Sequence, residues 1–371
     1  MRKKFCAIVF GSLAACNIAL SQVDFSGMAS VDLLKSAPSQ SPRWVNEGRP
    51  TFAWRGDLFM NGIVSDNVAV LANVRIDSTE RPFFDYFAIR ITHVSPLDVN
   101  LQVGKFDMPF GNLGERRFPR YNALYDLPLI YEYRTAVPNY PLAGLGELEY
   151  WRGKGLGLRL LDGGIYDIGA MAYGSFDICT YALAVSNGTV STADYSTENL
   201  KNEFGKIARI TVTPFAGLTI GGGYAWGSYI PSALSSSTED VTEYDQRDGE
   251  LDISFSRGHL VFNGEILRGV WETPVGNTTV DLGVWGYYAE AKYTIIPRLY
   301  AALRVNGLQF DTVQFGSYAE RWDENVAEVE AGLGYFIERN VLLKLVRRET
   351  RTYGGTYPKD NLTVGELAVS F

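Results

Sequence analysis

Apolar and polar residues alternate one by one along most of the chain, and a helical period is hard to find. Two of the clearest stretches are 68–76 and 327–335, where every second residue is Val, Ile, Leu, Ala or Tyr. Alternation with a period of two is typical of β-strands that present one apolar and one polar face. The alternating stretches are about 9 to 14 residues long, which is the length a tilted strand needs to cross a bilayer.

The connectors between these stretches are of two kinds that alternate along the chain. Short connectors lie at 65–67, 95–98, 213–217, 256–258, 296–298 and 337–340. Longer polar segments lie at 35–50, 107–144, 188–203, 229–244, 312–324 and 353–361. Short turns at one end and long loops at the other are the arrangement of an outer-membrane barrel. A soluble sandwich has no reason to sort its loops in this way.

The number of strands depends on the segment Leu145–Gly174, because a single-chain bacterial barrel needs an even count. If this segment forms one long strand the barrel has 16 strands, and if it forms three the barrel has 18. We predict an all-β fold, a transmembrane antiparallel β-barrel of 16 strands, with 18 as the alternative. Its periplasmic turns are short and its extracellular loops are long. Either size is wide enough for an aqueous channel.

The N-terminus has the pattern of an export signal. Basic residues occupy positions 2–4, an apolar stretch covers 5–20, and small residues stand at Ala19 and Ser21. We therefore predict a signal peptide at 1–21 that is cleaved near Ser21, followed by a single barrel domain at 22–371.

Cysteine usage agrees with export. Cys6 and Cys16 lie in the predicted signal and leave Cys179 alone, so neither a disulfide nor a cysteine-based metal site is expected. A lipoprotein signal is the alternative, because residues 13–16 resemble a lipobox that would be lipidated on Cys16.

The last residues form a third signal. Leu367, Val369 and Phe371 alternate with Glu366, Ala368 and Ser370, and an aromatic residue comes last. This pattern resembles the C-terminal β-signal that barrel-insertion machinery recognises, so we expect that machinery to be a partner through Phe371. The expected location is the cell outer membrane of a Gram-negative bacterium, in contact with outer-membrane lipid and lipopolysaccharide.

Composition and charge exclude other classes of protein. No run of about 18 apolar residues follows the N-terminus, which disfavours a helical membrane protein. The formal net charge is −8, and loss of the three basic residues at 2–4 would make it more negative. This negative charge disfavours a nucleic-acid-binding protein, which needs a basic surface.

Two segments resemble the phosphate-selective porin O/P family. They are 103–111, with the sequence VGKFDMPFG, and 181–188, with the sequence YALAVSNG. The resemblance implies a 16-stranded porin that forms a homotrimer and folds long loops into its lumen. It does not define the solute.

The strand phase opposite the lipid-facing residues should face the lumen, so the charges that line the pore can be predicted. The basic candidates are Arg55, Arg75, Arg90, Arg159, Arg209, Lys292, Arg304 and Lys344, and the acidic candidates are Asp32, Asp57, Asp252, Glu265, Glu290, Glu328, Glu330 and Glu366. The two signs balance, which predicts a zwitterionic lumen. Ion pairs within the wall are the alternative role for each of these residues.

The segment 107–144 is the candidate for a loop that folds inward and narrows the channel. It combines arginines with Phe118 and five tyrosines, and arginine clusters bind anions with forked geometry. We hypothesise an electropositive constriction at Lys105, Arg116, Arg117, Arg120 and Arg134. The alternative is a loop that caps or braces the barrel.

Signs of catalysis are weak. His93 and His259 are the two histidines, and no hydrolase or metalloprotease motif is present. The acidic run at 239–252 lacks EF-hand spacing, so we expect a solvated loop there rather than a calcium site. Neither catalysis nor a cofactor or metal is expected.

The predicted function is that of a porin for passive diffusion of small hydrophilic solutes, with anions such as phosphate as candidates. Two alternatives remain at this stage. One is a non-conducting structural or adhesive barrel, and the other is a barrel hydrolase that uses a histidine.

Overall fold

A computed structural model describes residues 23–36, 48–78, 81–95, 98–162, 166–194, 203–235, 240–353 and 361–371. The predicted signal peptide at 1–21, the candidate lipidation site Cys16 and most of the predicted loop 35–50 lie outside these residues.

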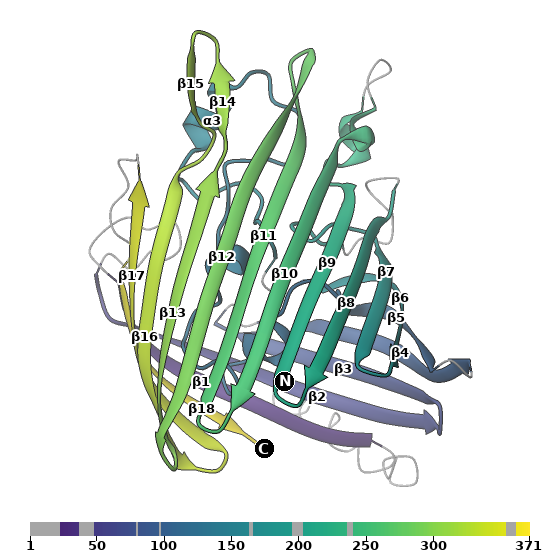
Figure 1. Ribbon diagram of the computed structural model, residues 1–371, viewed down its shortest axis with the longest axis vertical. Helices are drawn as coiled ribbons and strands as arrows, with labels where there is room; N and C mark the ends of the chain where they lie inside the picture. Colours follow the sequence, from purple (N-terminus) through teal and green to yellow (C-terminus); the bar gives the residue numbers. More distant parts are fainter. Residues whose placement is uncertain are drawn as a thin grey trace, which may run out of the picture.

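Sixteen of the strands in the described part of the chain form one closed antiparallel barrel (Figure 1). They are β1 (Val23–Ser36), β2 (Thr51–Ser65), β3 (Val68–Asp77), β4 (Phe83–Ser95), β5 (Val99–Asp107), β6 (Tyr166–Phe176), β7 (Cys179–Ser186), β8 (Gly205–Phe215), β9 (Leu218–Ser228), β10 (Asp245–Arg257), β11 (Leu260–Val275), β12 (Thr278–Ile296), β13 (Leu299–Phe310), β16 (Asn325–Glu338), β17 (Val341–Tyr353) and β18 (Leu362–Ser370). Neighbours along the chain pair with each other, and β1 pairs with β18 to close the wall. The predicted all-β barrel of 16 strands is confirmed.

The segment 145–174 does not form the single long strand on which the count of 16 was based. Only its last part enters the wall, as β6, whereas Gly146–Trp151 forms the short helix α3 inside a long inserted loop. The apolar side chains of Leu148, Leu160 and Leu161 are buried in that loop's core rather than turned toward lipid. We call residues 108–162 the inserted loop, which therefore extends beyond the predicted end at Gly144.

The connectors are sorted by length, as predicted. Tight turns join the strands at one end, and the longer segments lie at the other (Figure 1). The longer segments carry the 3-10 helices η3 (Ser232–Leu234) and η4 (Val241–Glu243). They also carry a separate hairpin, β14 (Thr312–Phe315) with β15 (Tyr318–Arg321). No helix among the described residues is long and apolar enough to cross a membrane.

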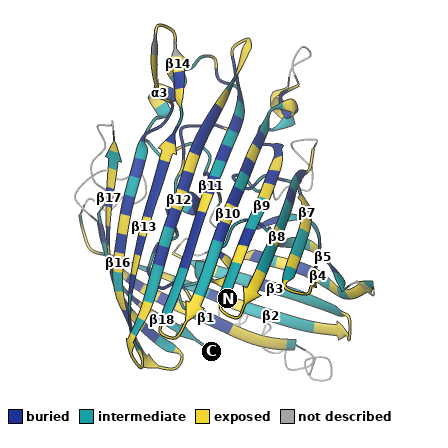
Figure 2. Cartoon of the chain, viewed as in Figure 1, coloured by how far each residue is buried: buried dark blue, intermediate teal, exposed yellow. Residues whose placement is uncertain are grey.

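Buried residues alternate with more exposed ones along wall strands such as β10 and β13 (Figure 2). In β17, Leu343 and Leu345 are exposed on the outside, whereas Lys344 and Val346 are buried on the inside. An Arg or Lys facing lipid at the bilayer midplane costs about 2–4 kcal/mol, which explains why the charged phase points inward.

The inserted loop packs against one side of the lumen. It contains η2 (Gly114–Arg117), α2 (Leu129–Glu132) and α3, and its apolar side chains join those of β11–β13 in one buried core. Gly286 of β12 permits the close approach, because a Cβ there would lie 2.5 Å from Cγ2 of Ile130. Backbone bonds also tie the loop to the wall, from Leu142 N to Pro274 O at 2.9 Å and from Gly276 N to Leu142 O at 2.8 Å.

Candidate functional site

Three cavities lie beside the inserted loop in the described part of the lumen. One, of about 490 Å³, is lined by residues near the loop end of the wall, such as Trp54, Asp77 and Ser78, and we call it the loop-end cavity. Two others, of about 610 and 510 Å³, reach residues near the tight turns, such as Asp24 and Asp98, and we call them the turn-end cavities.

Arg117 lines all three cavities. Its Nη2 lies 2.5 Å from Oδ2 of Asp107, its Nε donates to Gly114 O at 2.7 Å, and its guanidinium lies 4.9 Å from the centre of the Tyr166 ring. Asp107 and Tyr166 face each other in the register of β5 and β6, so two wall strands fix the position of the arginine. We call these three residues the Arg117 junction.

The Arg117 junction keeps its charge. Burial opposes the charge of the Arg117 guanidinium and is the largest single effect, but the charges and hydrogen bonds of Asp107 and Tyr166 together outweigh it, so the pKa of Arg117 is raised. The Arg117 side chain therefore remains a cation between the cavities.

The other four candidates for the constriction do not gather at this point. Arg116 donates to Tyr288 Oη at 2.7 Å, and Lys105 donates to Phe84 O at 2.7 Å. Arg120 lies toward the turn end, where it donates to Arg339 O at 2.7 Å. Arg134 donates to Gly157 O at 3.3 Å within the inserted loop.

Most of the predicted pore-lining cations are engaged by neighbours. Three of them form ion pairs: Arg75 with Asp77 at 3.2 Å, Arg209 with Asp252 at 2.6 Å, and Lys344 with Glu366 at 2.8 Å. Arg90 donates a hydrogen bond to Gln102 at 3.5 Å. The ammonium nitrogen of Lys292 lies 5.5 Å from the centre of the Tyr300 ring. Arg159 lies in the inserted loop, where it pairs with Asp162, and not in a wall strand as predicted.

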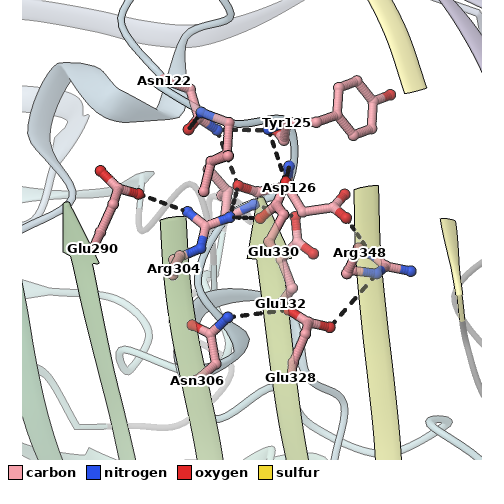
Figure 3. A network of polar contacts seen from close by, with 12 residues as sticks. Asn122, Tyr125, Asp126, Glu132, Glu290, Arg304, Asn306, Glu328, Glu330 and Arg348 are labelled. Atoms are coloured by element: carbon pink, nitrogen blue, oxygen red, sulfur yellow. Dashed lines mark hydrogen bonds and ion pairs between the residues drawn. The ribbon is translucent and has the colours of Figure 1, made fainter. Parts of the chain in front are cut away.

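Arg304 belongs to a buried network that fastens the inserted loop to the wall (Figure 3). It pairs with Glu290 at 3.0 Å and with Glu330, and it donates to Asp126 O at 2.5 Å. Arg348 pairs with Asp126 and lies 3.6 Å from Glu328. Sequence reasoning missed Arg348, although it shares the inward phase of Lys344 on the same strand.

Asp323, which follows β15, is a second anchor for the loop. Its carboxylate accepts backbone N–H bonds from Ala136 at 2.8 Å, Gly153 at 3.0 Å and Glu324 at 2.8 Å. Burial raises the pKa of Asp323 to about 7, against the lowering effect of the three donors. Two distant points of the inserted loop are therefore held by one side chain.

Catalytic chemistry has little support among these residues. His93 lies in a tight turn 4.0 Å from Asp98, and the ring of His259 contacts Thr294 O at 2.8 Å beside another turn. Neither histidine lines the three cavities. Within the described ranges, no group of three or more His, Cys, Asp or Glu side chains could hold a metal ion.

No protein-family model and no curated protein sequence matches the chain. Solved structures do match its fold. The anion-selective porin from Comamonas acidovorans superposes with a TM-score of 0.63 at 9% identity, over 94% of this chain and 99% of that one. The outer membrane channel DcaP of Acinetobacter baumannii gives 0.60 at 11% identity, over 94% and 97%. The trimer form of OmpT from Vibrio cholerae gives 0.57 at 10% identity, over 94% and 99%.

The chain has the fold of these porins. At such low identity the likeness shows the fold alone, and the resemblance to the phosphate-selective porin O/P family stays a prediction.

Proposed function

We propose that this protein is a porin, a passive channel of the outer membrane for small hydrophilic solutes, without enzymatic activity. The observation that carries the proposal is that three cavities share Arg117 in their linings, inside a closed barrel with an apolar exterior. Two of the solved structures with this fold are described as an anion-selective porin and an outer membrane channel, which supports the same function.

The proposal includes the setting in which a porin works. A signal peptide at 1–21 exports the chain, barrel-insertion machinery engages Phe371, and the barrel lies among outer-membrane lipid and lipopolysaccharide. A homotrimer is part of the proposal, because one solved structure of this fold is a trimer form. The mass of the purified complex in detergent tests this part.

The solute path that we propose runs from the loop-end cavity past the Arg117 junction to the turn-end cavities. Solutes then pass a charged pair and an aromatic ring at one point, which sets the size limit by contact and electrostatics. The lumen between the inserted loop and β11–β13 takes no part, because apolar side chains fill it.

Planar-bilayer recording tests the channel and its constriction together. Arg117→Ala removes the side chain shared by all three cavities, so we expect single-channel conductance to rise by about 1.5- to 2-fold. Arg347→Ala is the control, because Arg347 is an exposed arginine on the outer face of β17 that pairs with Glu349. A purified, folded barrel that opens no pore would contradict the proposal.

A non-conducting adhesive or structural barrel is the second candidate. The extensive core between the inserted loop and the wall favours it, since such a core would also suit a plug. The same recordings separate the two functions.

A further inference from the structure

The loop-end cavity carries more carboxylates than cations. Seven Asp and Glu side chains line it against four arginines. Each arginine is also held by a carboxylate: Arg55 by Asp57 at 2.7 Å, Arg75 by Asp77 at 3.2 Å and Asp85 at 3.6 Å, Arg117 by Asp107 at 2.5 Å, and Arg159 by Asp162. No arginine of this cavity is left to present an uncompensated positive charge to a solute.

Two of the carboxylates lie side by side and are buried in the wall. Asp32 of β1 and Glu366 of β18 are partners in the register that closes the barrel, and they are 6% and 2% exposed. Glu366 Oε2 pairs with Lys344 Nζ at 2.8 Å, and Asp32 Oδ2 accepts a bond from Tyr125 Oη at 3.4 Å. One oxygen of each carboxylate therefore already has an ion-pair or hydrogen-bond partner.

The remaining oxygens, Asp32 Oδ1 and Glu366 Oε1, have no hydrogen-bond donor among the described residues. A buried carboxylate oxygen without a donor or a cation is costly, and both residues line the loop-end cavity, so a cation that enters between them would relieve this cost. Lys344 and Arg55 are the cations near this pair, and Arg55 is itself paired with Asp57, so two cations face three carboxylates. The pair therefore retains an acidic field toward the cavity.

The chemistry of the pair selects the kind of cation. Divalent ions need several oxygen ligands, and the described residues contain no group of three or more His, Cys, Asp or Glu that could hold a metal ion. Two carboxylate oxygens with water suit a singly charged ion or the three donors of a primary ammonium group.

We propose that the channel admits cations in preference to anions, and that Asp32 and Glu366 hold a passing alkali ion or primary ammonium group. The inference rests on the proposed channel function and defines its solute class. It replaces the electropositive constriction hypothesised from the arginines with an acidic entrance.

Reversal potentials across a bilayer under a potassium chloride gradient, repeated with methylammonium chloride, test the proposal. The wild-type protein should favour K⁺ and methylammonium over Cl⁻. Asp32→Asn keeps the shape of the side chain and should lower this preference by about two- to threefold, since it removes one unit charge beside the path. Glu349→Gln is the matched control, because it removes a carboxylate from the exposed outer face of β17 and should change nothing.

Asp162→Asn gives a second measurement if Asp32→Asn lowers the yield of folded barrel, because Asp162 is a partly exposed side chain of the inserted loop. It should shift the reversal potential in the same direction. Glu366→Gln is avoided, because it would leave Lys344 buried without its carboxylate.

Two results would overturn the inference, and they differ from each other. A conducting pore that prefers chloride, or whose preference is the same in Asp32→Asn and Asp162→Asn as in the wild type, removes the cation proposal and leaves the channel intact. A folded barrel without conductance removes the channel function as well.

Discussion

Single residues fix the inserted loop at a few points, and Asp323 shows how one side chain can do so. Its two oxygens accept three backbone N–H bonds that water cannot replace in a buried site. A buried intramolecular hydrogen bond contributes about 0.5–1.5 kcal/mol, so three of them to one side chain make Asp323 one of the stronger contacts of the loop.

We expect the stability of this contact to depend on pH. The pKa of Asp323 rises from its ordinary value of 3.8 to about 7 when the loop is docked, so the docked loop binds the proton more tightly. Its contribution is then fully present below about pH 4 and is lost as the pH rises through 7. Hydrogen exchange of the Ala136 and Gly153 amides, corrected for its intrinsic pH dependence, measures this opening.

Asp323→Asn is the matching variant. An amide offers one acceptor oxygen in place of two, so at least one backbone donor loses its partner, at a cost of about 1–3 kcal/mol. Exchange of the two amides should be faster, and its dependence between pH 4 and 7 should disappear. Unchanged exchange in the variant would show that the loop is held elsewhere.

At the scale of elements, the inserted loop and the wall behind it form a single packed unit. Leu160 lies over two glycines of neighbouring strands, since a Cβ at Gly269 would lie 2.9 Å from its Cδ1 and one at Gly286 would lie 3.2 Å from its Cδ2. Because these two wall positions are glycines without side chains, the Leu160 side chain of the loop has room to pack there. The constriction is therefore positioned by packing as well as by ion pairs.

Gly286→Ala tests this packing. The added methyl group meets Ile130 of α2, and overpacking of this kind costs about 1–3 kcal/mol. We expect the loop to shift and single-channel current to become noisier and to change in size. Gly365→Ala is the control, because a Cβ at Gly365 meets nothing within 4 Å. Identical recordings from both variants would argue against a packed loop.

The alternation of residues predicts the wall but not the loop. Period-two patterning identifies strands such as β3 and β16, because lipid and water impose opposite demands on the two faces. The segment 145–162 was wrongly assigned to a strand, because its apolar residues do not face lipid. They pack in a core with strands that are distant in the sequence. Arg117 was among the predicted residues, yet its meeting with Tyr166 depends on how the loop folds back, which local pattern does not encode.

At the scale of the whole molecule, the barrel closes where its first and last strands meet. Gly27 N donates to Phe371 O at 3.0 Å, Phe371 N donates to Gly27 O at 3.0 Å, and the Phe371 ring covers the space where Gly27 lacks a side chain. Aromatic packing of this kind adds to the backbone bonds of the seam.

Phe371→Ala removes the ring from the seam, so we expect it to lower the fraction of chain that refolds into a closed barrel in detergent, by several-fold at equal protein concentration. Heat-modifiable migration in gel electrophoresis measures this fraction. Phe176→Ala is the control, because Phe176 is an aromatic residue at another tight turn that is about as exposed as Phe371 (79% against 73%) but lies away from the seam. Equal folded fractions for the two variants would assign no special role to the C-terminal ring.

The pairing of β1 with β18 also bears on the order of assembly. These strands are more than 300 residues apart, so the register from Met28 opposite Ser370 to Ser36 opposite Leu362 is among the least local in the molecule. Closing so long a loop is slow compared with forming neighbouring hairpins. Until the seam forms, β1 and β18 each present an unpaired edge, and it is at this stage that a nascent barrel is most exposed to mispairing with another chain.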